Sequence, residues 1–184
     1  MQIHPHFLFN TLNTMYGFAL KKSEQTPEII LKLSGLLDYI LYQVNKPFVL
    51  LQDEIQHIEN YISLEKVRFQ NHLQIDFNCD TFSKTTTIPP MLLLPFVENA
   101  FKHGKRIDGI LSIVININNN GKTLLFNIKN SSTKQEPSKN GIGLENIRKR
   151  LQMLFNDKFD LKIMEQSQQF DVSLKIPLNY DTKI

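Results

Sequence analysis

The sequence predicts an α+β protein in which a helical half is followed by an α/β sandwich. Its 184 residues leave room for one globular domain and a smaller helical one. Up to about residue 70 the apolar residues recur at helical spacing, whereas beyond Asn71 they alternate with polar residues, as in strands. We therefore expect a helical domain over residues 1–70 and a second domain over residues 71–184.

Apolar periodicity and two prolines divide the first half into helices. Pro27 suits the first turn of a second helix, and Pro47 is expected to end it. A third helix is predicted from about Asp53 to Arg68. Helices with so broad an apolar stripe must bury it, and packing against a second copy does so, which predicts a homodimeric bundle. The stripe of the second helix comprises Ile30, Leu33, Leu37, Ile40, Leu41 and Val44.

The second half alternates strand and helix patterns. A turn is expected at Asn120 and Gly121, so the strands on either side of it form a hairpin in an antiparallel or mixed sheet. The polar stretch over residues 131–140 predicts a mobile loop. The expected strands cover residues 73–77, 113–117, 124–128, 159–163 and 170–176, and the expected helices cover residues 90–103 and 143–155.

Composition excludes several classes of protein. The 21 basic and 18 acidic residues are interspersed and give a net charge of only +3, which argues against nucleic-acid binding. No apolar run reaches the roughly 18 to 20 residues that cross a bilayer, so this segment is not expected to span a membrane. The single cysteine, Cys79, cannot form an internal disulfide and belongs to no zinc-site spacing, which favours a reducing, cytoplasmic setting.

The first candidate motif is HPHFLFN at residues 4–10. Pro5 suits a helix start, and helical geometry puts Asn10 on the same face as His6, where its amide could hold a water or a phosphate oxygen. The simpler alternative is that His6 caps a helix whose phenylalanines are core.

The second motif is PFVENAFKHG at residues 95–104. Helical spacing puts Asn99, Lys102 and His103 on one face, with the apolar residues facing the sheet. The Asn99 amide oxygen suits Mg²⁺, and the two basic side chains suit phosphate. The alternative is an amphipathic helix with a solvated polar face.

The third motif is NGIGLENIRKRL at residues 140–151, with Gly141 and Gly143 directly before a helix. Glycines let the backbone approach a phosphate closely, and a helix N-terminus favours an anion. Glycines before a helix can also be nothing more than a turn.

Together these motifs resemble the LytS-type sensor histidine kinases, and the resemblance covers nearly the whole chain. In that family PHFLFN carries the phosphoacceptor, which falls on His6, and YISLEKVRF at residues 61–69 resembles the second dimerisation helix. The resemblance implies a Bergerat-type ATP site. Its N-box falls on Glu98, Asn99, Lys102, His103 and Gly104, and its lid motif on Gly141, Ile142, Gly143, Leu144, Asn146, Arg150 and Leu151.

Two departures from the family pattern concern the recognition of adenine and the phosphoacceptor histidine. Where relatives carry a DNGxG-like segment whose aspartate binds adenine, this chain reads IKNSS, with Asn130 at the aspartate and Ser132 near the glycine. An amide oxygen can still accept a hydrogen bond, but without the strength of a carboxylate. His4 stands where relatives usually have asparagine, and the register favours His6 as acceptor.

The resemblance implies that ATP with Mg²⁺ phosphorylates His6 and that the phosphoryl group passes to an aspartate of a response-regulator protein. Asn99 would lie near Mg²⁺, Glu98 is a candidate base, and Asn10 could assist the reverse or hydrolytic reaction. The resemblance also implies a homodimer and a cytoplasmic domain of an inner-membrane sensor protein. One alternative is a dimeric signalling module with a degenerate nucleotide site, which Asn130 favours. Another is an ATPase of the same fold, which the PHFLFN segment argues against.

Overall fold

The computed structural model describes residues 5–133 and 142–178. The chain forms two compact units, each described here by itself. The first unit consists of Met1–Gln70 and Thr87–Leu94, and the second consists of Asn71–Thr86 and Pro95–Ile184. The first unit therefore includes a short segment that lies well beyond residue 70 in the sequence.

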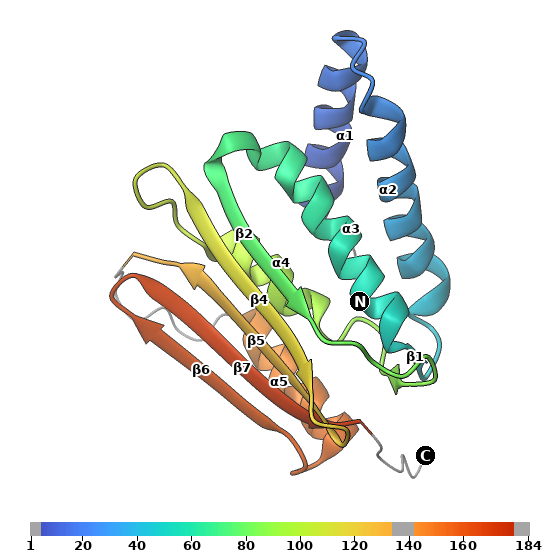
Figure 1. Cartoon of the computed structure of the whole chain (residues 1–184), viewed down its shortest axis with the longest axis vertical. Coiled ribbons are helices and arrows are strands. Elements are labelled where there is room, and N and C mark those ends of the chain that lie inside the picture. Colours follow the sequence, from blue (N-terminus) through green and yellow to red (C-terminus); the bar gives the residue numbers. More distant parts are fainter. Residues whose placement is uncertain (1–4, 134–141, 179–184) are drawn as a thin grey trace. The chain divides into compact units, whose positions relative to one another are not determined.

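The first unit is built from three helices that contact one another in pairs (Figure 1). A single π-helical turn, η1, continues α2, and a two-stranded antiparallel ladder joins β1 to β3. A 3₁₀ turn over Gln70–His72 follows the last helix. The elements are α1 (Pro5–Leu20), α2 (Thr26–Asp38), η1 (Tyr39–Gln43), β1 (Val49–Leu50), α3 (Leu51–Phe69) and β3 (Thr87–Ile88).

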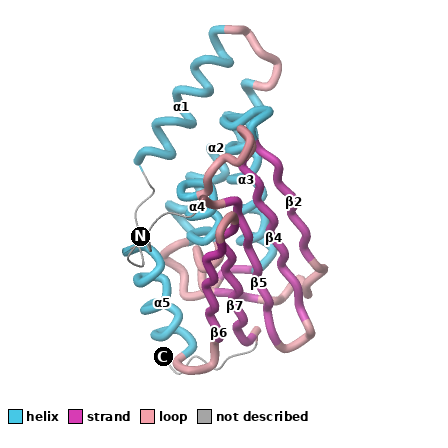
Figure 2. The backbone as a smooth tube through the Cα atoms, turned by 90° about the vertical axis from the view of Figure 1, so that its left-hand side faces the viewer, coloured by secondary structure: helices cyan, strands magenta, loops and turns pink. Residues whose placement is uncertain are grey.

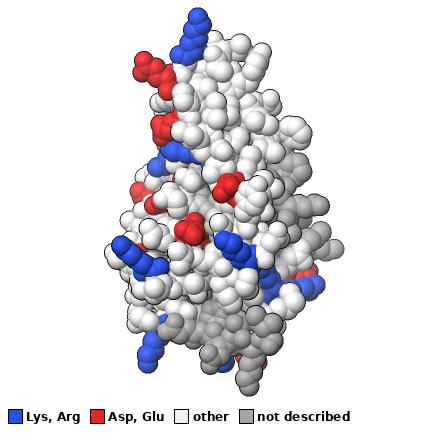
Figure 3. Space-filling model, turned by 90° about the vertical axis from the view of Figure 1, so that its right-hand side faces the viewer, with Lys and Arg blue, Asp and Glu red and all other residues white. Residues whose placement is uncertain are grey.

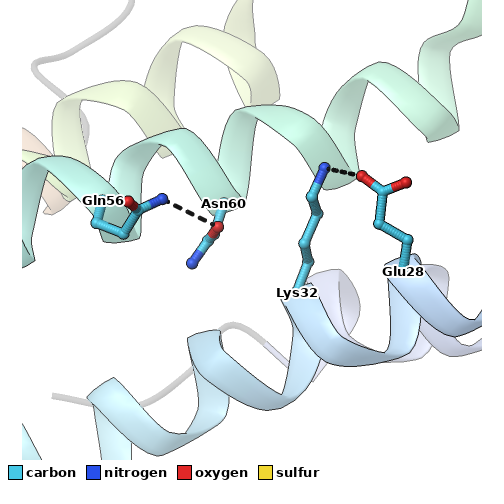
Figure 4. Close-up of polar contacts among 4 residues, drawn as sticks. All are labelled: Glu28, Lys32, Gln56 and Asn60. Carbon is cyan, nitrogen blue, oxygen red and sulfur yellow. Dashed lines mark hydrogen bonds and ion pairs between the residues drawn. The ribbon is translucent and has the colours of Figure 1, made fainter.

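Local signals explain where the second helix starts and how it is supported. Pro27 lies in the first turn of α2, as predicted, where a missing N–H costs no hydrogen bond. Glu28 and Lys32 form an i,i+4 ion pair of 2.7 Å on this helix (Figure 4). Helical backbone ends at Gln43, however, a few residues before the expected stop at Pro47. The buried face of α2 consists of Ile29, Leu33 and Leu36.

The second unit is a five-stranded sheet in the order β2-β4-β5-β7-β6. β2 pairs parallel with β4 and the other pairs are antiparallel, so the sheet is mixed. The helices α4 and α5 lie on one face of this sheet (Figures 1 and 2). The strands are β2 (Leu73–Cys79), β4 (Leu111–Asn119), β5 (Thr123–Ser131), β6 (Asp160–Gln166) and β7 (Gln169–Pro177), and the helices are α4 (Leu94–His103) and α5 (Ile142–Phe155).

The expected hairpin joins β4 to β5. Gly121 has φ +85°, a conformation that glycine adopts without strain. The side-chain oxygen of Asn119 accepts a hydrogen bond from the Gly121 amide at 2.6 Å, and that of Asn120 accepts one from the Thr123 amide at 2.9 Å. Asparagine amides thus close the turn, as their frequency in such turns suggests.

Two further predicted boundaries were wrong. The helix expected from Pro90 begins at Leu94, because Met91 has φ +54° and a right-handed helix cannot pass through that conformation. Ser131 belongs to β5 rather than to the predicted loop, because the pairing with β7 continues to Gln169. The remainder of that predicted loop from residue 134 onward lies outside the described residues.

Charges of both signs are interspersed on the face that Figure 3 shows, with uncharged surface between them. No helix in residues 5–133 and 142–178 combines the length and apolar character of a membrane span.

Candidate nucleotide site

The helix α4 carries the polar face that the sequence predicted. Phe96 packs against Phe126 of β5, with ring centroids 5.7 Å apart, so the apolar face of α4 contacts the sheet. Asn99 is half-buried, and Lys102 and His103 are exposed on the other side. The buried residues of α4 include Phe96, Val97, Ala100 and Phe101.

The end of α4 lies against the strand that carries Asn130. A Cβ added to Gly104 would overlap the carbonyl oxygen of Ala100 and the side chain of Leu111, and would lie 3.3 Å from Asn130 Nδ2. Only a residue without a side chain fits there. Asn130 is 5% exposed and donates a hydrogen bond from Nδ2 to the Ser131 carbonyl at 3.0 Å.

Ser131 fixes the chain that follows Gly104. Its hydroxyl donates to the Lys105 carbonyl at 2.6 Å, and its carbonyl accepts from the Lys105 amide at 2.9 Å. The Ser112 amide donates to the same hydroxyl at 3.0 Å. Two hydrogen bonds therefore tie Lys105, directly after the candidate N-box, to Ser131 of β5, and the third ties Ser131 to β4.

The first turn of α5 lies beside Asn99. A Cβ built on Gly143 would stand 3.9 Å from Asn99 Oδ1, so the two residues are in close proximity although 44 positions apart in sequence. Leu144 is half-buried next to it. Gly141 lies outside the described residues. The structure thus brings Asn99 together with Gly143, and Gly104 together with Asn130, around a single helix.

The electrostatic environment of α4 favours an anion. The pKa of His103 is lowered by its partial burial and by the positive charges of Lys102 and Lys105. A proton on His103 is disfavoured because two cations already lie close by. The same positive potential would attract the negatively charged phosphate oxygens of a nucleotide.

The candidate acceptor belongs to the first unit. His6 and Asn10 fall within α1, but nothing of their side chains is described, and His4 lies outside the described residues. Glu98, the candidate base, is half-buried on α4 and belongs to the second unit. The proximity of Glu98 to His6 is therefore not part of the described geometry.

Neither Glu54 nor Ser131 was identified from the sequence as a residue with a role near the site. Glu54 is fully buried and Ser131 makes the hydrogen bonds above. A signal for Glu54 was present, because it falls three residues after Leu51 and four before Ile58, on the apolar face of its helix. No comparable signal marks Ser131, whose role depends on the strand register.

Among the described residues, Asn99 could contribute an oxygen to Mg²⁺ that is bound together with a nucleotide. Within residues 5–133 and 142–178, no group of three or more His, Cys, Asp or Glu is arranged to hold a metal ion. Mg²⁺ at phosphoryl-transfer sites needs only one or two protein oxygens, with substrate phosphates and water completing its shell. Asn99 Oδ1, beside Gly143, is an oxygen of this kind.

Comparison with known proteins shows a consistent family relationship. Residues 1–73 match the model of the family described as Histidine kinase. The chain is 31% identical over 180 residues to the Sensor histidine kinase BtsS of Escherichia coli K12, covering 96% of this chain and 32% of that protein. It is 31% identical over 192 residues to the Sensor protein LytS of Staphylococcus saprophyticus, with the same coverage. The chain thus spans about a third of the length of these relatives.

Solved structures share the fold at low sequence identity. The histidine kinase AdeS of Acinetobacter baumannii superposes with a TM-score of 0.54 at 13% identity, covering 90% of this chain and 84% of that one. The histidine kinase domain of the blue-light activated kinase EL346 of Erythrobacter litoralis gives 0.55 at 13% identity, covering 95% and 96%. These likenesses confirm the predicted α+β class, with helices followed by an ATPase-type α/β sandwich.

Proposed function

Since the chain belongs to the histidine kinase family, we propose that it is a sensor-kinase core of the LytS type that uses ATP to phosphorylate its own His6. The phosphoryl group then passes to an aspartate of a response-regulator protein. The observation that carries the proposal is the position of Gly143 beside Asn99, which joins the candidate lid motif to the candidate N-box. Two sequence motifs 44 positions apart meet where one nucleotide could contact both.

Each part of ATP has a proposed partner in the second unit. Asn130 accepts from the adenine amino group through its side-chain oxygen, since its nitrogen already donates to Ser131. Lys102 and His103 contact phosphate oxygens, and the backbone at Gly141, Gly143 and Leu144 approaches the phosphates from the start of α5. Asn99 would hold Mg²⁺ through its side-chain oxygen, and the ion would supply positive charge to neutralise the phosphates.

The acceptor chemistry is proposed for the first unit. A neutral imidazole nitrogen of His6 attacks the γ-phosphorus in line as the bond to the β–γ bridging oxygen breaks, and ADP leaves. Glu98 is the candidate base that receives the proton of the imidazole, and Asn10 orients a water in the hydrolytic reaction. Positioning supplies most of the rate in such a transfer because the protein forms no further covalent bond.

The same proposal includes a homodimer formed by the first unit. Apolar side chains remain exposed on α1 at positions that follow i, i+3, i+7 and i+11, a single helical stripe. Such a stripe is stabilised by a partner surface. Its members are Phe9, Leu12, Tyr16 and Leu20. We further propose that this chain is the cytoplasmic part of an inner-membrane sensor protein, in keeping with its partial coverage of its relatives.

A second candidate is a non-enzymatic signalling dimer with a weak nucleotide site. Asn130 favours it, because an uncharged amide replaces the carboxylate expected for adenine recognition. Its burial, at 5% exposed, and its bond to Ser131 would also suit a purely structural residue.

One labelling experiment separates these functions. The protein is incubated with ATP labelled at the γ-phosphate and Mg²⁺, and the product is tested for the acid lability and alkali stability of phosphohistidine. We expect label in the unchanged protein and in His4→Gln, but none in His6→Gln, which should still bind ATP. Label retained in His6→Gln would refute the acceptor. ATP binding without any label would favour the signalling dimer, and release of phosphate without label would indicate an ATPase.

Asn99→Ala tests the proposed nucleotide site. It should abolish Mg²⁺-dependent ATP binding in calorimetry while the circular dichroism spectrum stays unchanged.

A further inference from the structure

A buried carboxylate on α3 holds the segment that leads into α4. Glu54 is fully buried, and its Oε2 accepts hydrogen bonds from the Met91 amide at 2.8 Å and from the Tyr39 hydroxyl at 2.5 Å. Its Oε1 accepts a third from the Leu93 amide at 3.1 Å. All three partners are donors, which is the arrangement that satisfies a carboxylate. One side chain thus joins α3, η1 and the segment before α4.

The segment before α4, residues 87–93, is held at two points. β3 pairs with β1, which directly precedes α3, and Glu54 holds the chain again a few residues later. Met91, whose amide is one of the two that Glu54 binds, has φ +54°, a conformation that residues with a side chain rarely adopt. Such backbone persists where its surroundings hold it, and it clusters at switch regions. The hydrogen bond from its own amide to Glu54 is one such restraint.

The third donor comes from an irregular turn. Tyr39 is the first residue of the π-helical turn η1, and its ring stacks on that of His57 with centroids 4.2 Å apart. Single π-turns within helices are rare and occur often at functional sites. A return of this turn to α-helical register would rotate the residues within it relative to α3, and the bond from Tyr39 to Glu54 belongs to the π-helical arrangement that is observed.

The segment held by Glu54 ends where the chain passes from the first unit to the second. Leu93 belongs to the first unit and is followed directly by α4, whose residues from Pro95 onward, Asn99 among them, belong to the second. Any freedom in this segment is freedom in a connection between the acceptor-bearing unit and the nucleotide-binding unit.

We propose that Glu54 is a positioning residue for phosphoryl transfer, which couples the π-turn at Tyr39 to the connection that precedes α4. This rests on the proposed kinase function. With the carboxylate bound to all three donors, the connection is rigid and the nucleotide-binding unit presents ATP productively to His6. With the Tyr39 bond broken, ATP still binds, because every residue proposed to contact ATP lies in the second unit, but transfer to His6 slows.

The test uses Tyr39→Phe, which removes only the hydroxyl and keeps the ring against His57. The matched control is Tyr42→Phe, in the same turn but exposed. We expect Tyr39→Phe to lower kcat for histidine phosphorylation by about tenfold without changing the Kd for ATP, since small misplacements of reacting groups cost much rate. Tyr42→Phe should match the unchanged protein in both quantities.

Glu54→Gln completes a double-mutant cycle. Glutamine replaces one carboxylate oxygen by an NH₂ group, which is a donor and cannot accept a hydrogen bond from the Met91, Leu93 or Tyr39 donors. We therefore expect a larger loss of kcat than in Tyr39→Phe, and no further loss when Tyr39→Phe is added. Additive losses would refute the coupling through Glu54. A lower melting temperature with an unchanged kcat in Tyr39→Phe would also refute the proposal, as would a Kd for ATP that rises in proportion to the loss of rate.

Hydrogen exchange distinguishes a failure of this inference from a failure of the kinase function. The Met91 and Leu93 amides should exchange faster in Tyr39→Phe than in Tyr42→Phe, whether or not the protein is labelled by ATP. Absence of label in the unchanged protein would refute the kinase function alone, whereas equal exchange in both variants would refute the coupling.

Discussion

At the scale of single residues, His57 is buried on α3 with its ring against Tyr39. It is 2% exposed, and within the described residues neither ring nitrogen has a hydrogen-bond partner. Burial lowers the pKa of His57 from 6.5 to about 4, because the charged form would lose its hydration. The unfolded chain therefore binds a proton at a higher pH than the folded one. Stability should be intact above pH 6.5 and fall as the pH drops from 6.5 toward 4.

His57→Phe should remove this pH dependence while keeping a ring against Tyr39. We expect the free energy of unfolding, measured by urea denaturation, to fall by about 2 kcal/mol less between pH 7 and pH 5 than in the unchanged protein. Glu65 acts in the opposite direction, since burial raises its pKa to about 7, so its contribution is present at low pH and lost as the pH rises through 7. The comparison of variant with parent cancels the Glu65 effect. Identical pH slopes would contradict the assignment to His57.

Asn130 offers a second prediction at this scale. Asn130→Asp gives the adenine amino group a charged acceptor, and hydrogen bonds to charged groups exceed neutral ones by roughly 1 kcal/mol, so ATP affinity should rise several-fold. The same change removes the bond from Nδ2 to Ser131, so the free protein should lose about 1 kcal/mol of stability. GTP should gain nothing, since guanine presents an oxygen at that place. Equal changes for both nucleotides in calorimetry would show that Asn130 does not contact the base.

At the scale of elements, the close approach of α4 to the sheet depends on Gly104. Gly104→Ala places a methyl group into the Ala100 carbonyl, which is backbone and cannot turn away. We expect a loss of about 1 to 3 kcal/mol in unfolding free energy, the usual cost of overpacking, and weaker ATP binding. Gly17→Ala in α1 is the control, because nothing lies within 4 Å of its added Cβ, and it should gain up to about 1 kcal/mol. Equal effects of both substitutions would show that the contact is not tight.

The elements also show how far periodicity reaches. The amphipathic face of α4, the β4–β5 hairpin and the helix expected over residues 143–155, which begins at Ile142, were all predicted, because each depends on neighbours within a few residues. The start of α4 was not predicted correctly, because the apolar run before it reads equally well as helix. Its backbone is decided by Glu54, 37 positions before Met91.

At the scale of the whole molecule, the exposed stripe of α1 predicts a dimer of the intact chain. Tyr16→Glu places a charge at the centre of that stripe, and burying an unpaired charge is costly, so the dimer Kd should rise by more than about tenfold. Met153→Glu is the control, since Met153 is 78% exposed on α5 in the second unit. Sedimentation equilibrium measures the dimer Kd of both variants and of the unchanged protein. A dimer unaffected by Tyr16→Glu, or weakened equally by Met153→Glu, would place the interface elsewhere.

The sequence by itself determined the α+β class, the family resemblance and most of the candidate nucleotide residues. These follow from short-range patterns, in which the spacing of a few residues fixes which side chains share a face. Only the tertiary structure decided that Gly143 lies beside Asn99, that the backbone at Gly104 approaches Asn130, and that Glu54 accepts hydrogen bonds from Met91 and Leu93. These contacts join residues more than 25 positions apart. They depend on strand register and helix packing, which local periodicity does not encode.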